Sequence, residues 1–355
     1  PGRTWGSLVA REVANRVYRV WGTQERRCAT AGADPAAEGF SLIGDVQNVA
    51  SFTTTVGADP AAAPTQLVGL CEPRTGSTKF KIRYYRGEVR AVNNSRGENR
   101  TINATSIESY LRGVVPRESP AEWGAAAGGA GMNALRAQSV AARSYSATEN
   151  RYAGLARTCD TQDCQVYGGA GTRTSAMANI VAIEDWRSDR AVSETALMIR
   201  VRPAAPLVPV STEFSSSNGD RTAGVNFQPV DDPGDKIDYN PYSRWTRVLD
   251  LESFAARFGL ATITKIEVSI DPSVSTGTYG VTPAWAVRFR FYNGTQSVYV
   301  KASEIKSAYD LPSPSITARI IKRDVSSNDD FVFISDSVGA SVADSAGSGE
   351  LPILL

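Results

Sequence analysis

The sequence predicts an α+β fold, in which mixed and antiparallel strands surround a central helix. Two stretches alternate apolar and polar residues as half-buried strands do, KFKIRYYRGEVRAV at 79–92 and WAVRFRFYNGTQSVYVKA at 285–302. Between them, a long helix is expected to begin at about Met132. With 355 residues, of which 42% are apolar, the chain can bury a substantial core.

Both strand stretches contain a turn signal. Arg86-Gly87 suits a hairpin turn in the first stretch, and Asn293-Gly294 is a strong type I′ signal in the second. TKIEVSI at 264–270 and the segment near Ile305 are expected to add further strands.

The expected helix follows a glycine-rich lead. At 100° per residue, one face repeats small and apolar side chains, namely Leu135, Ser139, Ala142 and Ser146. Small residues occur on the other sides too, so the helix is expected to be packed around most of its girth. Gln138 and Arg143 must then find polar partners or line a cavity, because a buried polar group without a partner is costly.

Three regions are expected along the chain. Residues 1–78 form an N-terminal extension that is partly irregular, with a short helix in SLVAREVANRVYRVW at 7–21. Residues 79–320 form the main domain. Residues 321–355 form a C-terminal tail that is partly flexible, because GASVADSAGSGE has a low-complexity composition.

The composition argues against several classes of function. With 38 basic and 37 acidic residues, the net charge of +1 creates no global field that favours nucleic acid as a partner. The sequence contains no apolar run near the roughly 20 residues of a transmembrane helix, and PGRTWGSL lacks the regions of a signal peptide. We therefore expect no transmembrane, signal or anchor segment in this chain. Histidine is missing, which excludes a Ser-His-Asp triad and most catalytic zinc sites.

The four cysteines, Cys28, Cys71, Cys159 and Cys164, allow three pairings if all are oxidised. The local pair in CDTQDC is the easiest to close, and its spacing is too wide for a redox C-x-x-C motif. We expect structural disulfides, with a Cys28–Cys71 bond as the one that would tie in the N-terminal extension. Disulfides in turn predict an oxidising, extracytoplasmic compartment.

Glu118 stands between two prolines in GVVPRESPAEWG at 113–124. Pro116 and Pro120 fix their own φ and restrict the residues before them, so the carboxylate is held on a stiff backbone. Such stiffness suits a catalytic acid, which must lie within hydrogen-bond reach of the bond being cleaved. A solvated loop residue is the plainer alternative.

Glu122 is assigned a structural role. Ser119 and Glu122 fit a capping box, with Pro120 at the first helical position. Glu118 is then expected just outside the N-terminus of the helix that follows.

A second candidate segment is CDTQDCQVYGG at 159–169. Its plainer interpretation is a surface loop pinned by a disulfide. Gln165 and Tyr167 alternate along an extended run after the cysteines and present an amide and a phenol in one direction. Such groups bind sugar hydroxyls and acetamides well. The Ser-rich turn SSSNG at 215–219 is a third candidate, weak when taken alone.

Taken together, these segments resemble the SpoIID/LytB family of bacterial cell-wall proteins. The similarity runs from about Tyr84 to Leu311. It rests on motifs in a fixed order, namely SIESYLRGVVPRESPAEWG, ALRAQSVAARSYSAT, CDTQDCQVYGG, FSSSNGDRTA, the DDP to NPYSRW segment and SEIKSAYDLPS.

The resemblance implies a peptidoglycan lytic transglycosylase with a SpoIID-like fold. Glu118 matches the catalytic glutamate of the family. It would first protonate the glycosidic oxygen of the β-1,4 bond between N-acetylmuramic acid and N-acetylglucosamine, and would then accept a proton as a 1,6-anhydro ring closes, unlike the two carboxylates of ordinary glycosidases. A glycan groove is expected from Gln138, Arg143, Gln165, Tyr167, Ser216, Ser217 and Asn218, with Cys159 and Cys164 clamping its wall. Arg143 could equally pair with a structural carboxylate.

Some residues depart from the family pattern. Ser119 stands where Met is usual, and Asp220 replaces a glycine of the Ser-rich motif. Asp163 occupies a position where zinc-binding members often have histidine, so we expect no metal and no cofactor.

Two other functions remain open. One is a non-catalytic module that binds glycan or enhances an amidase, and the other is a structural role in a cell-surface complex. The expected partners are peptidoglycan glycan strands and a cell-wall amidase or another envelope protein.

Overall fold

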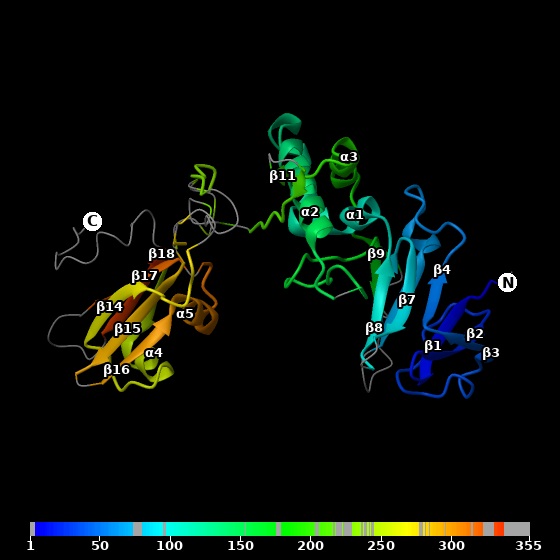
Figure 1. The fold of residues 1–355 in the computed structure, drawn as a ribbon, viewed down its shortest axis with the longest axis horizontal. Coiled ribbons are helices and arrows are strands. Elements are labelled where there is room, and N and C mark those ends of the chain that lie inside the picture. The colour runs from blue at the N-terminus through cyan, green and yellow to red at the C-terminus, as the bar shows by residue number, and fades with distance from the viewer. Residues whose placement is uncertain are drawn as a thin grey trace. The chain divides into compact units, whose positions relative to one another are not determined.

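The structure of this chain is a computed structural model. It describes residues 4–73, 80–94, 97–152, 154–174, 179–202, 206–215, 217, 222, 229–235, 237, 240, 242, 245–276, 280, 282–283, 285–294, 296–313, 315–321 and 330–336. The chain separates into two compact units, Pro1–Phe214 and Ser215–Leu355 (Figure 1). Both units combine helices with antiparallel sheets, which confirms the α+β prediction. In the described ranges no helix has the length and apolar character needed to cross a membrane.

The first unit begins with a three-stranded antiparallel sheet made of β1 (Ser7–Ala14), β2 (Val17–Thr23) and β3 (Ser41–Gln47). The helix predicted in SLVAREVANRVYRVW is therefore wrong, because this segment is the β1–β2 hairpin. Tyr18 and Val20 are buried at a period of two, as a strand requires, and Arg16 takes a positive φ of 60° in the turn.

Two further sheets follow in this unit. One sheet consists of β4 (Val49–Thr53), β7 (Glu88–Asn93) and β8 (Asn99–Ala104). The other contains β10 (Val181–Ala182), β9 (Gly171–Thr174), β6 (Phe80–Tyr85) and β5 (Val68–Pro73). The two strands predicted at 79–92 exist as β6 and β7. The hairpin predicted between them is wrong, because β6 and β7 belong to different sheets and Arg86-Gly87 is the corner between them.

The helical part of the first unit consists of α1 (Ile107–Glu118), a 3₁₀ segment (Ala121–Gly129), α2 (Met132–Thr148) and α3 (Trp186–Glu194). Helix α2 begins at Met132 as predicted. The side chain of Ser106 caps α1 by accepting a hydrogen bond from the backbone of Ser109. Leu111 and Val114 of α1 pack with Ala142 of α2 and Val89 of β7 in one buried cluster.

Short elements complete this unit. They are the 3₁₀ turn Pro64–Gln66 and the two-residue strands β11 (Val201–Arg202) and β12 (Val208–Pro209).

Buried ion pairs connect the helices to the sheets. Arg86, only 2% exposed, donates to both carboxylate oxygens of Glu184 at 2.7 and 2.6 Å. Arg112 of α1 joins the same carboxylate at 3.1 Å and also pairs with Asp189 of α3. Since a buried charge is tolerated only when it is paired, this network fixes α1 and α3 against the β6–β7 corner.

A second buried pair joins α1 to α2. Arg143 is 1% exposed, and its guanidinium donates to both oxygens of Glu108 at 2.9 and 2.8 Å. It also donates to the backbone carbonyls of Ser139, Val192 and Met198.

Gly113 allows α1 to lie directly against residues 167–169. A Cβ at this position would be 2.6 Å from the ring of Tyr167 and 2.7 Å from the carbonyl oxygen of Gly169. The carbonyl of Gly113 accepts a hydrogen bond from the backbone of Gly168 at 3.2 Å. This contact brings the end of α1 beside the CQVYGG segment.

The second unit has two three-stranded sheets around an aromatic core. One sheet is β14 (Lys265–Ile270), β15 (Val287–Asn293) and β16 (Gln296–Lys301), and the other is β13 (Thr246–Asp250), β18 (Phe331–Asp336) and β17 (Ile316–Ile321). Two helices, α4 (Leu251–Arg257) and α5 (Ala302–Tyr309), supply Phe254 and Ile305 to the same core as Phe289 and Phe291.

The predictions for this unit had different outcomes. Asn293 pairs with Gln296 across a turn in which Gly294 has a φ of 56°, so the predicted hairpin is confirmed. The strand predicted near Ile305 is wrong, because Ile305 is a buried residue of helix α5. GASVADSAGSGE lies outside the described residues.

We expect Gly113→Ala to destabilise the first unit by about 1–3 kcal/mol or more, because a buried methyl group would collide with Tyr167 and with the Gly169 backbone. Urea unfolding of the full chain measures this loss. Ala137→Ser is the control, since it also adds one heavy atom but on an exposed position of α2. Equal stability of the two variants would contradict the close contact.

We expect Glu108→Ala to cost about 3 kcal/mol, because it leaves the buried Arg143 charge without its carboxylate. Glu194→Ala is the comparison, since it breaks more exposed pairs with Arg136 and Arg190 and should cost about 1 kcal/mol or less. Hydrogen exchange of the α1 and α2 amides measures the difference locally. Similar protection in both variants would show that the Arg143–Glu108 pair does not stabilise α1 and α2.

Candidate active site

Glu118 is the last residue of α1, and a backbone amide binds its side chain. Oε1 accepts a hydrogen bond of 2.6 Å from the N–H of Val166. The side chain is half-buried, and Glu118 forms no ion pair with any residue that the structure describes. The carboxylate is thus oriented by one neutral donor.

The capping box predicted for Ser119 and Glu122 is wrong. Ser119 is the C-cap of α1, and its N–H bonds to the carbonyl of Val115. The following 3₁₀ segment has Pro120 as its N-cap, without a side-chain hydrogen bond. Glu118 therefore lies at the C-terminal end of a helix, where the backbone carbonyls carry partial negative charge, and not outside an N-terminus as predicted.

The two prolines have distinct positions around Glu118. Pro116 lies inside the last turn of α1, and Pro120 opens the next helical segment. The carboxylate is therefore carried on the last residue of α1, between two prolines that limit the backbone conformations near it.

The predicted disulfide between Cys159 and Cys164 is present, as is the one between Cys28 and Cys71. The first closes a short loop directly before Gln165. After this loop the chain runs past α1, which places the Val166 N–H at Glu118.

Gln165 and Tyr167, on either side of Val166, are both buried. Gln165 is fully buried, and its amide accepts from the Tyr110 hydroxyl at 3.1 Å and donates to the Ala142 carbonyl at 3.3 Å. The hydroxyl of Tyr167 donates to Asn103 at 2.7 Å. Both side chains hold the segment in place, and their contact with a glycan stays a prediction.

Three tyrosine rings form a cluster around Tyr167. The ring centroid of Tyr167 lies 4.7 Å from that of Tyr110 and 5.8 Å from that of Tyr85. Burial raises the pKa of Tyr85 to about 12 and also raises the pKa of Tyr110 and of Tyr167. The phenols stay protonated near neutral pH, so they act as hydrogen-bond donors and not as bases.

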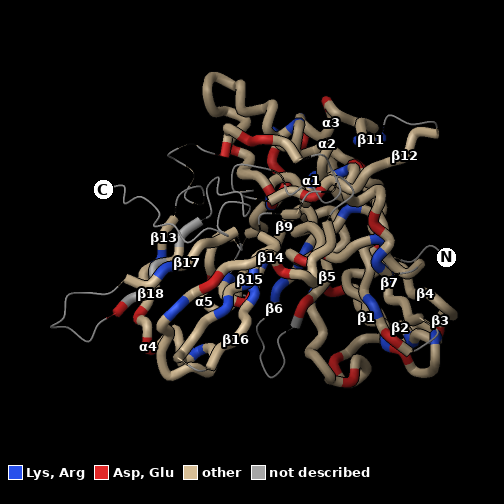
Figure 2. The backbone as a smooth tube through the Cα atoms, turned by 60° about the vertical axis from the view of Figure 1, so that its left-hand side comes forward, with Lys and Arg blue, Asp and Glu red and all other residues tan. Residues whose placement is uncertain are grey.

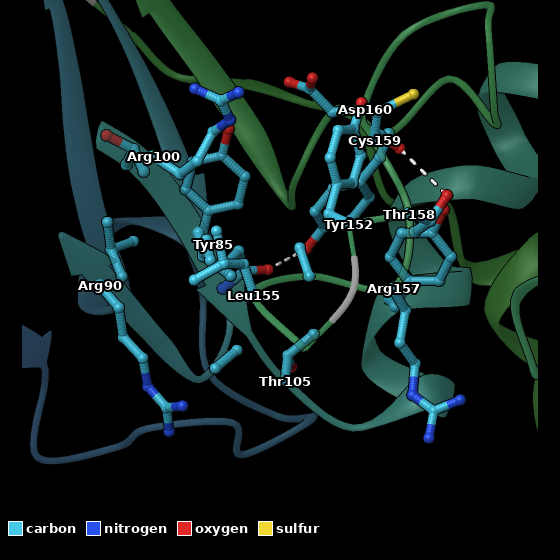
Figure 3. A pocket seen from close by; sticks show the side chains of 18 of the residues that line it. Tyr85, Arg90, Arg100, Thr105, Tyr152, Leu155, Arg157, Thr158, Cys159 and Asp160 are labelled. Carbon is cyan, nitrogen blue, oxygen red and sulfur yellow. Dashed lines mark hydrogen bonds between the residues drawn. The ribbon is translucent and has the colours of Figure 1, made fainter. Parts of the chain in front are cut away.

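A cavity of about 1180 Å³ is lined in part by the three tyrosines of this cluster (Figure 3). Its walls come from β5 to β8, the first turn of α1, the end of α2, and residues 152 and 155–160 of the loop after α2. Glu118 does not line this cavity, although Tyr110 and Tyr167 do. The two acidic side chains in its wall, Glu72 and Asp160, both pair with Arg83.

The other predicted groove residues have different environments. Arg143 pairs with Glu108, which agrees with the structural alternative considered for it. Gln138 is half-buried, and its amide nitrogen has no hydrogen-bond partner in the described part of the chain. Ser217 belongs to the second unit, where its hydroxyl donates to Asp235 at 2.8 Å. Ser216, Asn218 and Asp220 lie outside the described residues.

The structure adds Tyr110 and the backbone of Val166 to the site. Tyr110 could have been found in the sequence if SIESYLRGVV had been interpreted as a helix capped by Ser106. Tyr110 and Glu118 then lie about two helical turns apart on the same helix. The sequence carries no comparable signal for a backbone N–H.

Metal binding would need free ligands. All four cysteines are in disulfides, and the described residues contain no group of three or more Cys, Asp or Glu side chains placed to hold a metal ion.

Residues 95–201 match the family model of the stage II sporulation protein SpoIID. This stretch contains α1, α2, α3, Glu118 and the disulfide loop. No curated protein and no solved structure matches the chain. The resemblance to the SpoIID/LytB family that the sequence motifs indicate is confirmed over this range.

Proposed function

We propose that this protein is a peptidoglycan lytic transglycosylase in which Glu118 is the single acid and base. The observation that carries the proposal is the position of Glu118 in the SpoIID domain, at the junction of two helical segments, with one oxygen bound by the Val166 amide. The Val166 N–H takes one carboxyl oxygen, so the second is available for proton transfer.

The reaction needs two proton transfers. In its protonated form, Glu118 gives its proton to the oxygen that joins C1 of N-acetylmuramic acid to C4 of N-acetylglucosamine, and the C1–O bond breaks. The carboxylate then takes the proton of the C6 hydroxyl of the same muramic acid while O6 bonds to C1. The acid is regenerated and a 1,6-anhydro ring is formed, so no second carboxylate and no water are required.

Disulfide bonding supports an extracytoplasmic location. Two disulfides in one chain are typical of secreted and envelope proteins, since the cytosol keeps thiols reduced. Peptidoglycan glycan strands, and a cell-wall amidase or another envelope protein as a partner, fit such a location.

One observation favours a second candidate, a non-catalytic module that binds glycan. The cavity described above is lined by tyrosine and arginine side chains and excludes Glu118. A sugar held there would contact the tyrosines without meeting a catalytic acid. Product analysis separates this candidate from the enzyme.

We expect Glu118→Gln to lower the yield of 1,6-anhydro-muropeptides by a factor of about 10² or more, because the amide cannot donate an acidic proton. Intact and peptide-free peptidoglycan are incubated with the purified chain, and the products are analysed by mass spectrometry. The glutamine keeps an oxygen for the Val166 N–H, so a normal melting curve is expected.

Glu122→Gln is the matched control for this experiment. Glu122 lies four residues further on and is exposed, so its variant should retain full activity. If the unaltered protein sediments with the wall but yields no anhydro product, the enzyme proposal fails and the binding module stands.

The two disulfides should have separable effects. The Cys28–Cys71 loop spans 43 residues and the Cys159–Cys164 loop spans 5. In the chain-entropy model the first stabilises by about 4 kcal/mol and the second by about 2 kcal/mol. We expect Cys28→Ser/Cys71→Ser to lower the melting temperature more, and Cys159→Ser/Cys164→Ser to lower activity more, because that loop positions the amide at Glu118. The reverse order for activity would contradict this role.

A further inference from the structure

The outer face of the β14–β15–β16 sheet lies outside the SpoIID domain. On the central strand, β15, Val287, Phe289 and Phe291 are buried, so the residues between them point to the opposite face. The strand register aligns three residues of each strand on that face, namely Lys265, Glu267 and Ser269, then Arg288, Arg290 and Tyr292, and finally Ser297, Tyr299 and Lys301. We name this set the basic face.

The basic face carries more positive than negative charge. Its four basic side chains are accompanied by Glu267 on the face and by Asp271 at its margin. Lys265 pairs with Glu267 at 2.6 Å, and Lys301 pairs with Asp271 at 3.2 Å. Figure 2 shows basic positions on these neighbouring strands.

Arg288 and Arg290 remain without an ion pair among the residues that the structure describes. In the described part of the chain each donates through Nε, Arg288 to the Ser269 hydroxyl at 3.2 Å and Arg290 to the Ser297 hydroxyl at 3.0 Å. Within those same residues, the terminal nitrogens of both guanidinium groups have no acceptor. These nitrogens form the fork that binds a carboxylate or phosphate in a bidentate manner.

Tyrosine rings hold the two guanidinium groups in place. Arg288 lies 4.4 Å from the ring centroid of Tyr299, and Arg290 lies 4.8 Å from that of Tyr292 and 5.1 Å from that of Tyr299. Tyr299 is 50% exposed. Since the side chains are already ordered, less conformational entropy is lost when an anion binds.

Protection of the sheet does not explain this arrangement. Charged residues that prevent aggregation are needed on edge strands, whereas Arg288 and Arg290 lie on the central strand. Two like charges that are two residues apart on one face also repel each other. An anionic partner would remove this repulsion.

The shape of the face indicates an extended ligand. Residues two apart on a strand are separated by about 7 Å, and adjacent strands by about 5 Å, so the charges spread over an open, flat area and not over a pocket. Exposed tyrosine rings beside arginines can stack on sugar rings while the arginines bind the acidic groups.

We propose that the basic face binds an anionic polysaccharide, a glycan chain that carries repeated acidic groups. Arg288 and Arg290 bind the acidic groups, and Tyr299 and Tyr292 contact the sugar rings. This inference does not depend on catalysis by Glu118.

Fluorescence anisotropy with the full chain tests the proposal. The probes are a labelled oligogalacturonate, a neutral dextran oligomer of similar size and a single-stranded oligonucleotide of equal charge. We expect the oligogalacturonate to bind in a salt-sensitive manner, the dextran not to bind, and Arg288→Gln/Arg290→Gln to weaken binding at least about tenfold.

Arg136→Gln/Arg190→Gln is the matched control, because it removes the same charge from α2 and α3 in the first unit. This control should change the affinity less than about twofold if binding depends on contacts between the basic face and the acidic groups of the probe, and not on the net charge of the protein. Tyr299→Ala should weaken oligogalacturonate binding, and melting curves show whether each variant is folded. Equal loss in both double variants, no binding by the unaltered chain, or tighter binding of the oligonucleotide would each overturn the proposal.

Discussion

The contact between α1 and residues 166–168 is the constraint on which the candidate site depends. Gly113 provides the space, the Gly168 N–H bonds to its carbonyl, and the Val166 N–H bonds to Glu118. Two hydrogen bonds along one helix fix both the distance and the register of the segment, and the disulfide just before it limits its alternatives. The orientation of the carboxyl group thus follows from the packing of one backbone segment against another.

The charges near this contact are divided into two kinds. Arg86, Arg112 and Arg143 are buried or nearly so, and each is paired with a carboxylate that connects secondary-structure elements. Glu118 is the carboxylate bound by a neutral amide instead. Burial raises the pKa of the neighbouring phenols Tyr110 and Tyr167 further above neutral, so Glu118 is the acid–base group in the proposed reaction. This environment is consistent with the proposed mechanism, in which Glu118 acts first as an acid and then as a base.

Sequence patterns predicted features that depend on local periodicity. Helix α2 and the Asn293-Gly294 hairpin agree with the structure because helix spacing and a turn dipeptide determine them locally. Segment 7–21 and Ile305 were assigned wrongly, since short apolar patterns fit a helix or a strand and tertiary burial decides between them. The motif predicts Glu118 as the catalytic residue, and this stays a prediction; its hydrogen-bond partner is a backbone N–H, which no side-chain pattern can show. The Arg143–Glu108 pair joins residues 35 positions apart, so only the fold reveals it.

Net charge alone is a poor guide to the partners of this protein. The near balance of 38 basic and 37 acidic residues creates no global field that favours nucleic acid as a partner. Opposite charges more than about 8–10 Å apart are screened from one another in physiological salt, so a ligand senses the local arrangement. Ion pairs with acidic residues neutralise the buried arginines of the first unit, whereas Arg288 and Arg290 have no ion pair in the described residues, although Glu267 lies opposite Arg290 on the neighbouring strand. An anionic glycan would therefore meet a positive surface on a protein that is nearly neutral overall, and its affinity should depend on these two arginines far more than on the total charge.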